Sequence, residues 1–257
     1  MRIKMFCFCN SLYFPLQKLL TSLTSLTSLT SLTSLTSRIL IPLIISILTS
    51  TQAWSQNNPL NPPQIAADVQ ILVLGDSLSA EFGLERGTGW VSLHEKKLNS
   101  TQTQNPLPPF TIVNASISGE TTAGGRSRLS ILLNKLHPKI LVIELGANDS
   151  LRGLSMESSK ANLDSMIQTA LNSKVKVLLV GNLAPANYGP SFNNDLKVMY
   201  RDLALKNHIP LVPFMLKGVA DAPNASTLFQ ADMLHPLAQA HPTILGNIWP
   251  ELNKLLH

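Results

Sequence analysis

Short apolar runs of strand length alternate with longer segments of helical pattern over residues 68–257. Five runs are predicted to be strands: VQILVLG (69–75), FTIVNAS (110–116), KILVIELG (139–146), KVLLVGN (176–182) and IPLVPF (209–214). Each is apolar almost throughout rather than alternating, which is typical of strands that are covered on both faces. The pattern therefore predicts a parallel sheet with helices on either side.

Helices are predicted between and after these strands, near 89–98, 123–136, 158–172, 192–206 and 242–255. This alternation requires crossover connections, which are right-handed in nearly all proteins. The predicted fold class is α/β, a flavodoxin-like three-layer α/β/α domain with a five-stranded parallel sheet. Ligands of such open sheets bind outside the carboxyl ends of the strands.

The first 55 residues have a different pattern. Residues 21–37 repeat the triplet TSL, and Arg38 precedes the ten-residue apolar run Ile39–Leu48. Small residues that a signal peptidase reads follow at 53–55. We predict a secretory signal that is cleaved after Ser55. The apolar run is shorter than the roughly 20 residues that span a bilayer, so no permanent membrane anchor is expected.

These features divide the chain into a signal peptide with its repeat (1–55), a linker (56–67) and one domain (68–257). A periplasmic or secreted location follows from the signal. Both cysteines, Cys7 and Cys9, lie in the segment to be removed, and this suits an oxidising compartment. Nothing in the pattern demands more than a monomer.

The charge of the domain excludes one class of partner. The whole chain has 20 basic and 15 acidic residues, but the first 55 residues hold four of the basic ones and none of the acidic ones. Removing that segment leaves 16 basic residues against 15 acidic ones. A nearly neutral domain lacks the basic face that nucleic acids require, so no nucleic-acid partner is predicted.

The end of the first predicted strand breaks the apolar pattern. Gly75, Asp76 and Ser77 place a carboxylate and a hydroxyl at the carboxyl edge of the sheet. Either polar residue also fits the simpler role of capping a following helix. A serine becomes a nucleophile only beside a base that a third group orients. A catalytic role for Ser77 therefore requires a suitably placed histidine.

His235 fits this requirement best. It lies in the loop ADMLHP, three residues after Asp232, and the proline that follows disfavours helical geometry at His235. The carboxylate can then fold back to one ring nitrogen and leave the other free. His241 also precedes a proline but has no acidic residue in the eight preceding positions. The other four histidines are predicted to lie at the surface: His94, His137, His208 and His257.

Two further strand ends offer hydrogen-bond donors for an oxyanion, which acyl transfer requires. Gly119 in SISGET leaves its N–H open to a ligand, and Asn148 in LGANDS has a side-chain amide. Each alone also fits an ordinary turn, as a turn glycine or an Asx turn. Their occurrence together with Ser77 and His235 favours a catalytic site.

The segments GDSLS, SISGET, GAND and DMLHP, in this order, resemble the four blocks of the SGNH (GDSL) hydrolases. The longer segments VNASISGET, VIELGANDSLRG and APANYG are similar to the bacterial multifunctional thioesterase, lysophospholipase and arylesterase branch. The resemblance runs from about Val69 to the C-terminus. It implies a serine hydrolase that cleaves acyl esters or thioesters, lysophospholipids among them. Such an enzyme works through an acyl-enzyme intermediate and needs neither metal nor cofactor.

The resemblance also implies a role for each site residue. Ser77 would be the nucleophile, His235 the general base and then acid, and Asp232 its orienting partner. The oxyanion hole would consist of the N–H groups of Ser77 and Gly119 and the side chain of Asn148. Ser79 would not react, and the sequence departs from the family at Ala147 and Ser150, where glycine is common.

The acyl-binding groove is predicted from the loop LAPANYGP (183–190), which borders that groove in the family. Simple packing of a proline-rich loop is the alternative. Burying each methylene contributes about 0.8 kcal/mol, so a groove of this kind would favour medium or long acyl chains. The predicted substrate-binding residues are Leu151, Leu154, Leu183, Ala184 and Pro185.

Two other functions fit parts of the pattern. One is a carbohydrate O-acetyl esterase acting on cell-envelope polysaccharide, which would share the catalytic residues. The other is a non-catalytic, flavodoxin-like binding module, which would have no need of Asp232 and His235.

Overall fold

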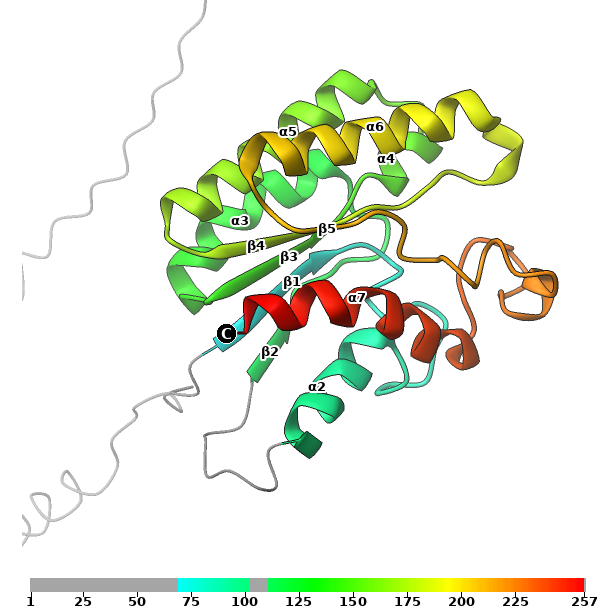
Figure 1. Ribbon diagram of the computed structural model, residues 1–257, viewed down its shortest axis with the longest axis horizontal. Helices are drawn as coiled ribbons and strands as arrows, with labels where there is room; N and C mark the ends of the chain where they lie inside the picture. The colour runs from blue at the N-terminus through cyan, green and yellow to red at the C-terminus, as the bar shows by residue number, and fades with distance from the viewer. Residues whose placement is uncertain (1–68, 102–110, 257) are drawn as a thin grey trace, which may run out of the picture. The chain divides into compact units, whose positions relative to one another are not determined.

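The computed structural model describes residues 69–101 and 111–256, and its centre is a five-stranded parallel sheet (Figure 1). The strand order is β2-β1-β3-β4-β5. This order, with helices on both faces, confirms the predicted fold class. The strands are β1 (Val69–Gly75), β2 (Thr111–Asn114), β3 (Ile140–Glu144), β4 (Lys176–Val180) and β5 (Leu211–Val212).

Two layers of helices enclose the sheet (Figure 1). Every predicted helix is present, with ends displaced by at most three residues. One layer consists of α2 (Trp90–Thr101) and α7 (His241–Leu255), and the other of α3 (Thr122–Leu136), α5 (Met156–Asn172) and α6 (Pro190–Asn207). The short elements are α4 (Ala147–Leu151), η2 (Ala186–Tyr188), η3 (Ala225–Thr227) and η4 (Ala238–Ala240).

The core has two parts because successive side chains of a strand point to opposite faces. In β1, Ile71 and Val73 pack toward α2 and α7, while Leu72 and Leu74 pack toward α3, α5 and α6. All four side chains are fully buried. Burial on both faces is the physical reason for the continuous apolar runs in the sequence.

Two predicted elements differ in the structure. The fifth strand is much shorter than 209–214, since Pro210 and Pro213 have no N–H to donate to the sheet. The turn after β1 does not lead directly into a helix. The chain instead continues through irregular turns as far as α2, and the N–H groups of Ser79 and Ala80 both donate to the Asp76 carbonyl.

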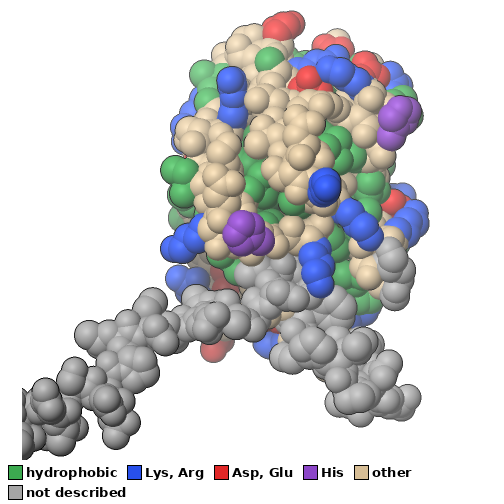
Figure 2. Space-filling model, turned by 90° about the vertical axis from the view of Figure 1, so that its left-hand side faces the viewer, with side chains coloured by type: hydrophobic (Ala, Val, Ile, Leu, Met, Phe, Trp, Pro, Cys, Tyr) green, Lys and Arg blue, Asp and Glu red, His purple; other side chains and the backbone are tan. Residues whose placement is uncertain are grey.

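The strands all run the same way, so the loops that follow them meet at one edge of the sheet (Figure 1). Figure 2 shows the opposite edge, at the amino ends of the strands, where many Lys and Arg side chains lie. The predicted signal and linker lie outside the described residues. In the part of the chain that is described, no helix has the length and apolar character to cross a membrane.

Candidate active site

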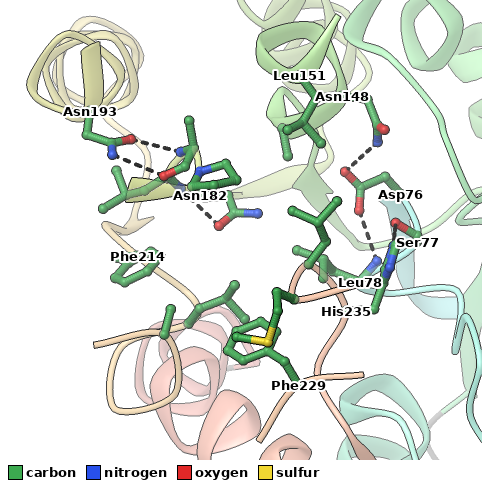
Figure 3. Close-up of a pocket in the computed structure, with 18 of the residues that line it drawn as sticks. Asp76, Ser77, Leu78, Asn148, Leu151, Asn182, Asn193, Phe214, Phe229 and His235 are labelled. Atoms are coloured by element: carbon green, nitrogen blue, oxygen red, sulfur yellow. Dashed lines mark hydrogen bonds between the residues drawn. The ribbon is translucent and has the colours of Figure 1, made fainter. Parts of the chain in front are cut away.

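The loop before η4 brings a histidine and a carboxylate to the end of β1. His235 Nε2 lies 2.8 Å from Ser77 Oγ (Figure 3), and His235 Nδ1 lies 2.6 Å from Asp232 Oδ2. The Phe82 ring packs against the imidazole, with 4.4 Å between ring centroids and an angle of 40° between the ring planes. The three predicted side chains therefore form one hydrogen-bonded row, which is the geometry that activates a serine.

The local turn explains the three-residue spacing. Asp232 Oδ1 accepts hydrogen bonds from the N–H groups of Leu234 and His235, at 2.9 and 3.1 Å. Met233, which lies between Asp232 and Leu234, has a positive φ of 57°. Partial burial by itself raises the pKa of Asp232, but the hydrogen bonds from the His235 ring and from the two N–H groups outweigh it and lower the pKa to about 2. Asp232 is therefore an anion at neutral pH.

Three hydrogen-bond donors lie at the ends of β1, β2 and β3. The N–H groups of Ser77 and Gly119 donate to no group of the described chain. Gly119 has a φ of +79°, and Arg152 Nη2 donates to its carbonyl at 2.7 Å. Asn148 Nδ2 donates one hydrogen to Asp76 Oδ2 at 3.0 Å, which leaves its second hydrogen for a ligand (Figure 3). These are the three donors predicted to form an oxyanion hole.

A buried carboxyl network lies beneath the Ser77 turn. Glu144 Oε2, at the end of β3, accepts from Ser79 Oγ at 2.7 Å and from the Asp76 N–H at 3.3 Å. Trp90 Nε1 donates to Ser79 Oγ at 3.1 Å. Asp76 Oδ1 in turn accepts from the Leu78 N–H. Asp76 thus supports the turn and also orients Asn148, but it caps no helix, since α2 begins only at Trp90.

Burial governs the charge of this network. Asp76 and Glu144 are each 1% exposed. Burial raises the pKa of Asp76 to about 6, although its hydrogen bonds oppose the shift. Burial and the neighbouring Asp76 raise the pKa of Glu144 well above its usual value. Both shifts favour the protonated form of the carboxyl group, and with a pKa of about 6 Asp76 is largely ionised at pH 7. Gly75 permits this contact because a Cβ there would lie 2.8 Å from Glu144 Oε2.

A pocket of about 380 Å³ opens beside Ser77 and His235 (Figure 3). Four predicted binding residues line it: Leu151, Leu183, Ala184 and Pro185. Leu154, predicted with them, is not among the lining residues and is 48% exposed. The loop after β3 turns it away from the pocket into solvent. Most other lining residues are apolar and include Leu78, Phe214, Leu216, Phe229, Met233 and Leu234.

The sequence gives little signal for the wall made by Phe214, Leu216 and Phe229. These residues follow β5, in segments without helical or strand periodicity, and their role depends on how those segments fold back over the sheet. Met233 and Leu234 lie within the predicted DMLHP block. Their proximity to His235 is the signal that could have identified them.

The structure corrects one prediction about the histidines. His94 was expected at the surface but is fully buried between α2 and α7, with its ring edge-on to Trp249. His137 and His208 are exposed, as predicted. His241 is buried and its Nδ1 accepts from the Trp90 N–H at 3.0 Å, so it does not face Ser77. His257 lies outside the described residues.

Comparison with known proteins decides the family. Residues 73–242 match the model of the GDSL-like lipase/acylhydrolase family. The chain belongs to this family. It is 43% identical over 193 residues to the esterase TesA of Pseudomonas aeruginosa, a match covering 75% of this chain and 92% of that protein. It is also 34% identical over 192 residues to "Thioesterase 1/protease 1/lysophospholipase L1" of Escherichia coli, with 75% and 86% coverage.

Solved structures of related enzymes have the same fold. The crystal structure of TesA superposes with a TM-score of 0.67 at 42% identity, covering 72% of this chain and 99% of TesA. The esterase EstA from Pseudoalteromonas superposes with a TM-score of 0.66 at 34% identity, covering 74% and 99%. These matches confirm the predicted family and branch. The GDSL hydrolase chain is a carboxylic ester hydrolase, and a non-catalytic binding module is not favoured.

Proposed function

We propose that this GDSL hydrolase cleaves acyl esters and acyl thioesters through a covalent intermediate on Ser77. The observation that carries the proposal is the row Ser77, His235 and Asp232 at the mouth of an apolar pocket. His235 Nε2 takes the Ser77 proton as Oγ attacks the acyl carbonyl, and Asp232 stabilises the resulting imidazolium. The N–H groups of Ser77 and Gly119 and the Asn148 amide stabilise the oxyanion.

The remaining steps of the reaction, departure of the leaving group and hydrolysis of the acyl-enzyme, use the same groups. His235 gives its proton to the leaving alcohol or thiol, which departs from the tetrahedral intermediate. A water molecule then loses a proton to His235 and attacks the acyl-enzyme, and Ser77 regains its proton when the carboxylic acid leaves. The chain's own residues thus supply each proton transfer that these steps require.

The substrates are acyl chains of medium or long length on lysophospholipids, aryl esters or thioesters. Relatives carrying the names thioesterase, lysophospholipase and arylesterase support these substrate classes. The apolar lining of the pocket supports the chain length, because each methylene that leaves water contributes about 0.8 kcal/mol. The signal pattern in residues 1–55 supports a location in the periplasm or outside the cell.

Replacing Ser77 tests the proposed nucleophile. Ser77→Ala is expected to lower kcat on p-nitrophenyl esters by at least about 10³-fold and to abolish labelling by a fluorophosphonate probe. Ser79→Ala is the matched control, because Ser79 is buried and donates to Glu144 instead of facing His235. The control is expected to remain labelled. Labelling of Ser77→Ala, or activity near the wild-type level, would refute the assignment.

A further inference from the structure

The exposed large apolar side chains are concentrated around the Ser77 site. Nine such side chains are exposed among the described residues, and seven of them lie in the loops and short helices that follow the carboxyl ends of the strands. These seven are 37–52% exposed. We call them the apolar rim: Phe82, Ile117, Leu151, Leu154, Tyr188, Met233 and Leu234. The other two, Ile131 and Leu205, lie on helices α3 and α6.

Contacts connect the rim to the mouth of the pocket. Leu151, Met233 and Leu234 line the pocket itself. Phe82 packs on the His235 ring, and the Tyr188 hydroxyl donates to the Leu151 carbonyl at 3.4 Å. The remaining two members are close in sequence to these groups.

Ile117 precedes Gly119 by two residues, and Leu154 follows Leu151 by three. Every strand of the sheet is therefore followed by a segment that contributes at least one apolar side chain to this edge.

The position of the rim decides what can cover it. A protein docked on the rim would close the opening through which substrate enters the pocket. A lipid surface would instead deliver the substrate, because the acyl chain of a lysophospholipid already lies in such a surface. A group of exposed apolar side chains around a pocket opening marks a surface that contacts a partner of this kind.

We propose that the apolar rim inserts into the headgroup region of a phospholipid surface, so that an acyl chain passes from lipid to the Ser77 pocket without crossing bulk water. This rests on the proposed function. Charged groups of both signs lie near the rim, namely Arg152, Asp232 and the ion pair of Glu120 with Arg128. Binding therefore depends on buried apolar area rather than on lipid charge.

A vesicle-flotation experiment tests the rim. The full chain is expressed. The same purified form, with or without the predicted signal, is used for every variant, so any contribution from residues 1–67 is common to all. Vesicles are zwitterionic phosphatidylcholine. The rim variant is Ile117→Ser with Leu154→Ser, two rim positions that neither line the pocket nor contact His235. The matched control is Ile131→Ser with Leu205→Ser, which are 69% and 66% exposed on helices away from the rim.

The rim variant is expected to bind vesicles at least about fivefold more weakly than the wild type, whereas the control binds within about twofold of it. Raising the salt from about 0.1 M to about 0.5 M is expected to leave wild-type binding almost unchanged, since screening does not act on apolar contacts. A wild-type chain that does not float, a rim variant that floats equally well, or a control that loses as much binding would overturn the proposal.

Hydrolysis of a soluble short-chain p-nitrophenyl ester, measured on the same preparations, separates the two proposals. Both double variants are expected to keep the wild-type rate, and this also shows that they are folded. Single variants at Ile117 and Leu154 replace the double variant if it loses that rate. Hydrolysis without rim-dependent flotation refutes the lipid-surface proposal alone, and rim-dependent flotation without hydrolysis refutes the proposed function.

Discussion

Glu144 shows how a single residue shapes the candidate site without facing the substrate. Its carboxyl group holds the residues on both sides of the Ser77 turn, through the Asp76 N–H and the Ser79 hydroxyl. Asp76 passes this restraint on to Asn148. Burial and the neighbouring Asp76 both favour the protonated form of Glu144, which lessens the repulsion between the two carboxyl groups. The position of two oxyanion donors, the Ser77 N–H and the Asn148 amide, therefore depends on Glu144.

Substitution of Glu144 tests this positioning role. Glu144→Ala is expected to lower kcat on a soluble ester by at least about tenfold with little change in KM, because the Asp76 N–H and the Ser79 hydroxyl lose their acceptor. Glu144→Gln keeps an acceptor oxygen in place and is expected to restore most of the rate. Steady-state kinetics with a thermal-unfolding control distinguish the two variants. Equal kcat values for them would contradict the positioning role.

At the scale of elements, the loop between β4 and α6 forms a wall of the pocket, and the Asn193 side chain fixes this loop at Ala184. Asn193 Oδ1 accepts from the Ala184 N–H at 2.8 Å, and Asn193 Nδ2 donates to the Ala184 carbonyl at 3.0 Å (Figure 3). These two hydrogen bonds satisfy the Ala184 N–H and carbonyl groups, which are not paired with a strand. Asn193 thereby keeps Leu183 and Pro185 against the pocket.

Asn193→Ala is expected to act more on long acyl chains than on short ones. Loss of both bonds leaves the Ala184 peptide groups unsatisfied and loosens the wall that contacts the distal methylenes. The kcat/KM for a long-chain p-nitrophenyl ester is expected to fall several-fold, with a smaller change for the acetate ester. Asn187→Ala, an exposed residue of the same loop, is the control. A chain-length profile identical to the wild type would show that the wall does not need this restraint.

At the scale of the whole molecule, buried ionisable groups set the pH range in which the fold is stable. Burial, assisted by the charge of Lys97, lowers the pKa of His94 to about 4. Neither ring nitrogen of His94 has a hydrogen-bond partner among the described residues. The folded chain therefore keeps His94 neutral, while the unfolded chain binds a proton below its ordinary pKa of 6.5. Its contribution to stability is complete above pH 6.5 and is lost as the pH falls through 4.

The other shifted groups act in different pH windows. The lowered pKa of Asp232 gives stability that is present above 3.8 and lost as the pH falls through about 2. The raised pKa values of Asp76 and Glu144 have the opposite sign, because their neutral forms are favoured in the fold. The Asp76 contribution is present below 3.8 and is lost as the pH rises through about 6.

Comparison of variants isolates the contribution of His94 to the pH dependence of the unfolding free energy. Between pH 7 and pH 4, His94→Phe is expected to lose about 2–3 kcal/mol less unfolding free energy than the wild type, since 2.5 pKa units correspond to at most about 3.4 kcal/mol. Urea denaturation at a series of pH values measures the difference. His137→Asn is the control, since His137 is exposed with a positive φ that Asn tolerates. Parallel pH curves for wild type and His94→Phe would contradict the assignment.

The amino-acid sequence by itself determined the layered fold and the residues of the candidate site. Both depend on local pattern. Apolar runs identify the buried strands, and a parallel sheet brings the ends of its strands to one edge, so Ser77, Gly119 and Asn148 are predicted to meet. The three-residue spacing of Asp232 and His235 is equally local, because one turn creates it.

The tertiary structure alone decided which side chains distant segments bury together. The contact between Asp76 and Glu144 joins residues 68 positions apart, and the burial of His94 depends on the packing of α2 against α7. The outward direction of Leu154 and the wall that contains Phe229 likewise depend on loops without periodicity. Such contacts follow from the three-dimensional path of the chain. A linear pattern of polar and apolar residues does not specify which distant segments come into contact.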